Sequence, residues 1–326
     1  MTLHPAYTER FPLLEGIDSF EQLVSDPTLD ERFHEFMQWR EAQAPPAVAA
    51  TDSTVSGPHG PVPVRTYEPS TAGTDRPALV WLHGGAFMMG DLDMPEADRT
   101  AREVCRRADA VVLSVDYRLA LGGVHYPVPH DDVVAVVRWV RESVASLGVD
   151  PDRISVGGAS AGANLATGAV LRLRDEDGWQ PAALVCAYGV FHPVLPELPP
   201  EVGELMSDVP ALLRFTPEQT AGITANYVGG PPDTADGYAM PARANLSGLC
   251  PTYLLDAEYD DLRASSEPFH DQLVVAGVLA RRQVVPSVMH GFLNLPAEID
   301  PVGTAFRLIS DVVAAPATTH QELSHA

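Results

Sequence analysis

The sequence predicts an α/β fold in which a mostly parallel central sheet carries helices on both faces. After the first two apolar runs, short apolar runs alternate with longer helical patterns, as in sheets whose parallel strands are joined by crossover helices. The chain has 326 residues, of which 45% are hydrophobic, and this is enough for one extended core. The expected strands are, in chain order, Val62–Tyr67, Ala78–Leu82, Ala110–Val115, Ile154–Val156, Ala182–Val185, Pro251–Leu255 and Arg282–Val285.

The clearest predicted helix spans Asp131 to Leu147. Its valines recur at helical spacing, so that four of them share one face. We interpret this stripe as core packing and assign it no chemical role. The four residues are Val133, Val136, Val137 and Val140.

Two segments interrupt the alternation of strands and helices. Residues 1–50 are amphipathic and end near the two prolines at 45–46, while residues 192–246 are rich in Pro, Gly and Met. Long insertions of this sort are usually lids or binding elements. Surface decoration is the alternative interpretation.

A Gly-x-Ser-x-Gly pentapeptide at residues 158–162 lies between an apolar run and a helix-forming stretch. This context predicts a strand, a tight turn and a helix, with Ser160 held in strained backbone geometry at the turn. The serine hydroxyl then stands above the sheet edge as a nucleophile. The alternative is a turn of small residues with no chemistry.

The predicted strand at 78–82 leads directly into the loop His83-Gly84-Gly85-Ala86-Phe87. Acyl transfer develops an oxyanion, and backbone N–H groups fixed in place stabilise it. The amides of this loop and the amide that follows the serine are the natural donors. We expect the oxyanion hole among Gly84, Gly85, Ala86 and Ala161, with Gly85 and Ala86 as first choices within the loop.

A general base and an orienting acid are expected at the ends of two later strands. His290 follows the strand-like run at 282–285, while His270 lies in a helical pattern and is interpreted as a surface helix residue. Serine, acid and histidine then follow in the chain order that a Gly-x-Ser-x-Gly hydrolase requires. Four carboxylates could supply the acid: Asp256, Glu258, Asp260 and Asp261.

Five motifs in this order resemble the hormone-sensitive-lipase-like esterases, bacterial family IV of the α/β-hydrolase fold. The resemblance covers about Val62 to Val313 and implies Ser160 as nucleophile, Asp260 as acid and His290 as base. The motifs are the loop at 83–87 with Gly90-Asp91-Leu92, residues 115–120, the serine pentapeptide, residues 257–260 with Leu262-Arg263, and residues 290–292.

The chain departs from the family pattern at four places. Ala86 replaces a third glycine, Ala159 replaces the usual Asp, a proline is missing after Ala120, and Asp261 replaces another proline. We expect Asp256 to bond the local backbone turn, and Asp261 to be a solvated neighbour of the acid.

The resemblance also implies that the two irregular segments form a cap over the serine. The chain then divides into an N-terminal cap segment (1–50), a first core part (51–191), a cap insertion (192–246), a second core part (247–315) and a tail expected to be disordered (316–326). We refer to residues 1–50 and 192–246 as the cap segments.

The predicted activity is hydrolysis of small, short-acyl carboxylic esters through an acyl-enzyme, because Ala86, Phe87 and Met88 crowd the acyl side. Phe87 and Met88 are therefore the expected substrate-binding residues. A lactonase or amidase on the same triad is one alternative, since a fold alone does not choose among hydrolases. A non-catalytic small-molecule receptor is an alternative of another class, although no triad member is missing.

Composition limits the partners. The net charge is −23, from 44 acidic and 21 basic residues, and all 21 are arginine. Such a surface repels phosphate backbones and anionic lipids, so we expect no nucleic acid and no membrane partner. With no signal-like start and no run of about 18 to 20 apolar residues, the protein is expected to be cytoplasmic.

Three cysteines, Cys105, Cys186 and Cys250, each lie near apolar residues. They are interpreted as buried small hydrophobes, because an odd number of scattered cysteines does not make a disulfide framework. No metal-ligand spacing or dinucleotide fingerprint stands out, so we expect no cofactor. The oligomeric state stays open, with a homodimer as one alternative.

Overall fold

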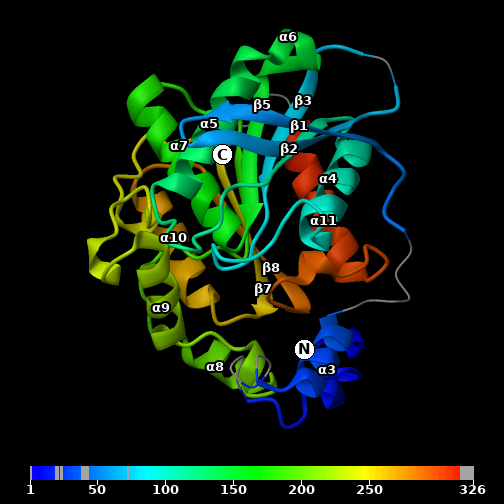
Figure 1. Cartoon of the computed structure of the whole chain (residues 1–326), viewed down its shortest axis with the longest axis vertical. Helices are drawn as coiled ribbons and strands as arrows, with labels where there is room; N and C mark the ends of the chain where they lie inside the picture. The colour runs from blue at the N-terminus through cyan, green and yellow to red at the C-terminus, as the bar shows by residue number, and fades with distance from the viewer. Residues whose placement is uncertain (1, 19–21, 23–24, 38–43, 72, 316–326) are drawn as a thin grey trace.

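The computed structural model describes residues 2–18, 22, 25–37, 44–71 and 73–315, and the tail at 316–326 lies outside this range. Within it, eight strands form one sheet in the order β1-β2-β4-β3-β5-β6-β7-β8 (Figure 1). The β1–β2 and β2–β4 pairs are antiparallel, and every pair from β4 to β8 in this order is parallel. The strands are β1 Ala49–Gly57, β2 Gly60–Glu68, β3 Arg76–Leu82, β4 Val111–Val115, β5 Val149–Ala159, β6 Leu184–Ala187, β7 Thr252–Tyr259 and β8 Ala280–Met289.

The mostly parallel sheet and the seven expected strands are confirmed, but the sequence prediction missed β1. This strand lies at the sheet edge, and among its nine residues only Val55 is buried. An edge strand with both faces wet carries no apolar alternation, so a search for periodicity passes over it.

The predicted helix at 131–147 is two helices, α5 (Val128–Glu142) and α6 (Val144–Leu147). They separate at Ser143, whose N–H donates to the carbonyl of Val140 and closes the last turn of α5. The expected valine stripe of α5 is fully buried in the core.

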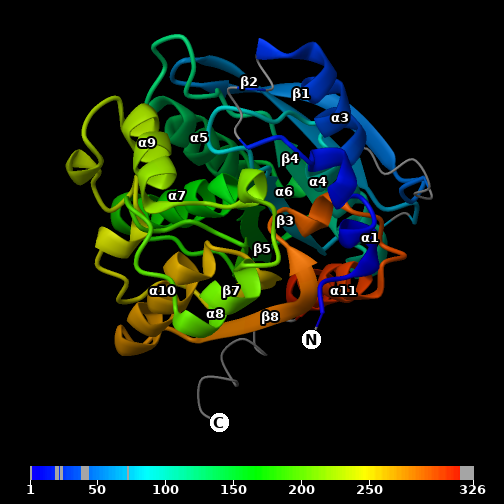
Figure 2. The ribbon, with the colours of Figure 1, turned by 90° about the horizontal axis from the view of Figure 1, so that it is seen from below.

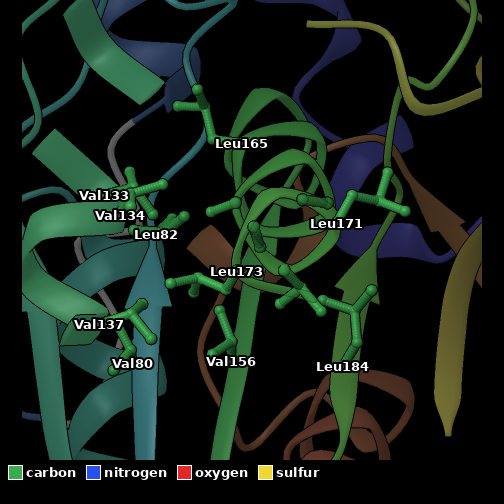
Figure 3. Packing of buried hydrophobic residues seen from close by; sticks show 14 of the residues in the cluster. Val80, Leu82, Val133, Val134, Val137, Val156, Leu165, Leu171, Leu173 and Leu184 are labelled. Atoms are coloured by element: carbon green, nitrogen blue, oxygen red, sulfur yellow. The ribbon is translucent and has the colours of Figure 1, made fainter. Parts of the chain in front are cut away.

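Helices cover both faces of the sheet. On one face α5, α7 (Ala161–Asp177) and α10 (Arg263–Val275) pack against the apolar side chains of the central strands, as the close view in Figure 3 shows for α5 and α7. On the other face α4 (Pro95–Ala108) and α11 (Asp300–Ala314) do the same. Each fully buried Val or Leu side chain of these layers stabilises the fold by about 1.5 to 3 kcal/mol. The carboxyl ends of the strands are therefore supported by a closely packed core.

The remaining helices belong to the two cap segments, apart from η5 (Phe292–Asn294). Leu14, Ile17 and Phe36 of the first segment form one hydrophobic cluster with Leu212 of the second. In Figure 1, α3 and α8 accordingly lie at the same end of the molecule, and Figure 2 views that end directly. The cap elements are α1 Pro5–Thr8, η1 Phe11–Leu14, α3 Pro27–Met37, α8 Pro200–Met206, η2 Ala211–Leu213, α9 Pro217–Val228, η3 Pro232–Thr234 and η4 Pro241–Arg243.

The three cysteines are buried and unpaired, as expected. Across the described ranges, no helix combines the length and apolar character needed to cross a bilayer.

Candidate active site

Ser160 stands at the turn between β5 and α7 with φ +53° and ψ −118°. This positive φ is strained for a residue with a side chain, and the two flanking glycines make the turn possible. A Cβ at Gly158 would lie 2.5 Å from the backbone of Gly162, and one at Gly162 would lie 2.2 Å from the carbonyl oxygen of Leu82. The Gly-x-Ser-x-Gly pattern is thus required by the close approach of β5, β3 and α7.

Ser160, His290 and Asp260 form one hydrogen-bonded chain. The Ser160 Oγ lies 3.0 Å from His290 Nε2, and His290 Nδ1 lies 2.8 Å from Asp260 Oδ2. With Nδ1–H donating to the carboxylate, Nε2 is left to accept the serine proton. The three residues lie at or just beyond the carboxyl ends of β5, β7 and β8, so the parallel sheet brings them together from positions up to 130 residues apart.

The charges around His290 favour its protonated form. Burial alone would lower the pKa of this imidazole, but the charge and hydrogen bond of Asp260 and the charges of Glu96 and Asp261 outweigh it and raise the pKa. A raised pKa makes His290 a stronger base and stabilises the imidazolium that forms during proton transfer.

Two of the other candidate acids have partners of their own. The expectation that Asp256 bonds the local backbone turn is wrong, because its carboxylate pairs with Arg282 of β8 at 2.5 Å. Glu258 accepts the N–H of Ser287 at 2.7 Å. Neither carboxylate has a hydrogen bond to His290.

The expectation that Asp261 is solvated is wrong. Its side chain is only 2% exposed and lies 2.8 Å from the guanidinium of Arg214. It also accepts the N–H of Phe215 at 2.8 Å. Asp261 therefore connects the loop after β7 to the cap insertion.

The loop after β3 turns sharply beside Ser160. Gly85, Ala86 and Phe87 all have positive φ, of +111°, +53° and +63°. A Cβ at Gly85 would lie 2.1 Å from the carbonyl oxygen of Met89, so this position requires glycine. Two consecutive non-glycine residues in this region are strained, and strain of this kind persists only where the surroundings enforce it.

Two side chains hold the backbone of that loop in this conformation. Glu96 of α4 accepts a hydrogen bond from the N–H of Gly84 at 2.6 Å. The Tyr117 hydroxyl donates to the carbonyl of His83 at 2.8 Å, and the Tyr117 ring stacks on the imidazole of His83. Because the Gly84 amide already donates to the Glu96 carboxylate, it is not available to an oxyanion. We therefore remove Gly84 from the predicted oxyanion hole. In the described part of the chain, no hydrogen bond uses the N–H of Gly85, Ala86 or Ala161.

Sequence reasoning missed Glu96 and Tyr188. Glu96 is buried, and it accepts the hydroxyl of Tyr188 as well as the amide of Gly84. Burial raises the pKa of this carboxyl, and these two hydrogen bonds and the charge of His290 offset part of the shift. The Tyr188 ring in turn packs edge-on against His290, with centroids 4.9 Å apart. Glu96 thus connects the loop after β3 to the side of the site that carries His290.

The two expected substrate-binding residues differ. The Phe87 ring is fully buried and stacks on Tyr227 of α9 with centroids 3.9 Å apart, so it supports the loop from behind and presents no surface to a substrate. Met88 is half-buried on the same loop. Phe215 of the cap insertion also lies close to the base, with its ring 4.8 Å from that of His290.

His270 lies on α10, as predicted, next to Asp271. In the described ranges, no group of three or more His, Cys, Asp or Glu side chains could hold a metal ion.

Comparison with known proteins agrees with this architecture. A family model described as the alpha/beta hydrolase fold matches residues 79–294. The chain belongs to this family, in its hormone-sensitive-lipase-like branch, bacterial family IV. Three similar proteins illustrate the relation.

The esterase LipI of Mycobacterium tuberculosis is 33% identical over 270 residues, which cover 79% of each chain. The carboxylesterase NlhH of the same species is 35% identical over 251 residues, covering 74% of this chain and 76% of that protein. The solved structure of a hyperthermophilic esterase from the archaeon Pyrobaculum calidifontis has a TM-score of 0.80 at 30% identity, covering 96% of this chain and 98% of that one.

Proposed function

We propose that this protein is a serine carboxylesterase that hydrolyses small, short-acyl esters through an acyl-enzyme. The observation that carries the proposal is the chain of hydrogen bonds from Ser160 through His290 to Asp260. Beside it lie the N–H groups of Gly85, Ala86 and Ala161, which make no hydrogen bond among the residues that the structure describes. The names of the similar esterases support the same reaction class.

In the proposed mechanism, His290 Nε2 accepts the Ser160 proton while the serine oxygen attacks the ester carbonyl carbon. The oxyanion accepts hydrogen bonds from the amides of Gly85, Ala86 and Ala161, the last of which also lies at the positive end of the α7 dipole. Asp260 keeps the imidazole in the tautomer that can accept the proton. His290 then returns the proton to the leaving alcohol, and water repeats the sequence on the acyl-enzyme.

The division of the chain into a core and two cap segments is part of the proposal. The cap insertion reaches the base through Phe215, and it reaches the oxyanion loop through the contact of Tyr227 with Phe87. Both contacts support a role for residues 192–246 in covering the site. A homodimer and a cytoplasmic location stay predictions, to be checked by sedimentation and by cell fractionation.

The decisive experiment compares the wild-type protein with Ser160→Ala on a simple aryl ester. Because nucleophile and base act as a unit, the variant should lose about 10⁴ to 10⁶ in turnover while its circular dichroism spectrum is unchanged. An organophosphate should label Ser160 in the wild type. A variant with much of the wild-type turnover, or a label on another serine, would contradict the proposal.

A panel of substrates tests the acyl preference. Aryl esters should be hydrolysed fastest at acyl chains of about two to six carbons, because longer chains must displace packed apolar side chains. Including a lactone and an anilide in the panel separates esterase from lactonase and amidase activity. Faster hydrolysis of long-chain triglyceride emulsions than of butyrate esters would refute the short-acyl preference.

A further inference from the structure

One ion pair joins the catalytic-acid loop to the cap insertion. The guanidinium of Arg214 contacts both oxygens of Asp261, at 2.8 and 2.9 Å, and its third nitrogen donates to the carbonyl of Met206 at 2.8 Å. Asp261 also accepts the N–H of Phe215. A bidentate pair with a buried carboxylate holds its partner in one orientation, which a single exposed ion pair does not do.

These bonds fix the residue that follows Arg214. The Arg214 guanidinium and the Phe215 N–H both donate to the Asp261 carboxylate. The backbone at 214–215 therefore has little freedom to move relative to Asp260, the residue before Asp261. The Phe215 ring is thereby held edge-on to His290, with centroids 4.8 Å apart, and its other contacts are to a small apolar cluster around Leu195 and Leu262. Phe215 is half-buried, so this apolar cluster does not cover the residue completely.

The position of the ring indicates which part of a substrate it would meet. A general base that takes the serine proton returns it to the leaving alcohol oxygen, so the alcohol part of the ester must lie next to His290. The acyl part extends from the carbonyl carbon on the serine, beside the loop at 85–88. A ring packed on His290 therefore borders the alcohol part.

We propose that Phe215 is a specificity-determining residue that favours esters of aromatic alcohols, and that Arg214 and Asp261 are positioning residues that hold its ring in place. The inference rests on the proposed ester hydrolysis. Aromatic rings prefer edge-to-face or offset partners by about 0.5 to 1.5 kcal/mol beyond their area, equivalent to about a two- to tenfold preference.

The test uses benzyl butyrate and cyclohexylmethyl butyrate, which share the acyl group and the carbon skeleton of the alcohol. The ratio of their kcat/KM values isolates the aromatic contribution. Phe215→Leu should lower this ratio about two- to tenfold relative to wild type, mainly through KM of the benzyl ester. Arg214→Gln and Asp261→Asn should lower it in the same direction, and the double variant should be no worse than the single ones, because all three break one contact.

The control is Arg138→Gln, which removes a bidentate Arg–Asp pair elsewhere. Arg138 contacts Asp177 at 2.7 and 3.1 Å between α5 and α7, and its partners lie outside the site. Its ratio should equal that of the wild type. Near-UV circular dichroism checks that each variant folds. If Arg214→Gln or Asp261→Asn does not fold, the conservative Phe215→Leu variant alone tests the inference.

The pH profile separates positioning from a general loss of structure. His290 faces Asp260 and Asp261 after β7, Glu96 of α4 and the ring of Tyr188, with Arg214 behind Asp261. Asp261→Asn removes a charge that raises the pKa of His290, so the acid limb of kcat/KM should move to lower pH. Arg214→Gln leaves that charge uncompensated and should move the limb to higher pH.

Opposite shifts of the acid limb together with equal falls in the ratio support the inference. An unchanged ratio in Phe215→Leu, in a wild type that hydrolyses both esters, overturns it and leaves the proposed function intact. A wild type that hydrolyses neither ester, nor any other in the panel, overturns the proposed function and this inference with it.

Discussion

The two loops that flank the catalytic serine are held by different parts of the molecule. The loop after β3 is braced from within the core, by Glu96 of α4 and Tyr117 after β4. The loop after β7 is tied to the cap insertion, through the pair of Asp261 with Arg214. The loop proposed to hold the oxyanion is therefore braced by the core, whereas the loop beside His290 is completed by the insertion at 192–246.

The backbone of the two loops differs in the same sense. Residues 85–87 all have positive φ, while none of residues 260–263 does. A strained loop needs support that cannot move away, and a buried carboxylate under Gly84 supplies it. An unstrained loop can depend on a contact with the cap insertion. We expect the first loop to be sensitive to core substitutions and the second to cap substitutions.

Among substitutions in the residues that hold these two loops, the largest effect should come from Asp260→Asn, on the base side. An amide presents the wrong hydrogen-bond partner to the imidazole, and in an analogous triad this costs about 10⁴ in turnover. Glu258→Gln is the matched control, because its oxygen can still accept the N–H of Ser287, and it should stay within about tenfold of wild type. Both are measured as kcat on an aryl acetate, and equal losses in the two variants would refute the assignment of the acid.

On the oxyanion side, Glu96→Ala should lower kcat by about 10² to 10³, the usual cost of losing one oxyanion donor, because it releases the loop that carries the donors. Glu96→Gln keeps an acceptor oxygen and should lose less. KM for a small ester should change little in either variant. If Glu96→Ala raises KM and leaves kcat intact, the carboxylate does not brace the oxyanion loop.

The pH dependence follows from the charges that face His290. His290 acts as a base only when its imidazole is neutral. The pKa of this imidazole is raised above its ordinary value of about 6.5, so the imidazole stays protonated, and inactive as a base, to a higher pH than a free histidine. As the pH falls through this raised pKa, kcat/KM should drop about tenfold per unit, with a midpoint above about 6.5. A midpoint clearly below that value would contradict the electrostatic picture, and Glu96→Gln should move the midpoint down.

The smallest expected effect is that of Tyr117→Phe. The variant keeps the ring that stacks on His83 and loses the hydroxyl, which donates to the buried His83 carbonyl at 2.8 Å and has longer contacts with His83 Nδ1 at 3.3 Å and the Gly84 carbonyl at 3.4 Å. Leaving one buried acceptor without a partner costs about 1 to 3 kcal/mol of unfolding free energy, measurable by urea titration. Turnover should fall less than in Glu96→Ala, and a larger fall would mean that Tyr117, not Glu96, is the main brace.

Much of the fold could be predicted because its signals are local. The central strands are short apolar runs, and the tight turn at Ser160 requires the small residues found around it. Ser160 and His290 could be proposed because each follows a predicted strand, whereas Asp260 could be chosen among four carboxylates only from the family resemblance. Edge strand β1 could not be found in this way, since a wet strand has no apolar pattern.

The partners of the charged residues could not be predicted. Glu96 and Asp98 both lie in the first turn of α4, yet Glu96 is buried under the oxyanion loop while Asp98 pairs with Arg102. Asp261 looked like a solvated neighbour of Asp260, and its partner stands 47 residues earlier in the chain.

The sequence by itself determined the sheet, the tight turn at the serine and the order of nucleophile, acid and base. Only the tertiary structure decided that the Gly84 amide is occupied, that Phe87 faces inward and that Asp261 holds Phe215 against His290. The physical reason is that periodicity and turn chemistry record how each residue relates to its own segment. The direction of a charged or aromatic side chain depends on which distant segment packs beside it.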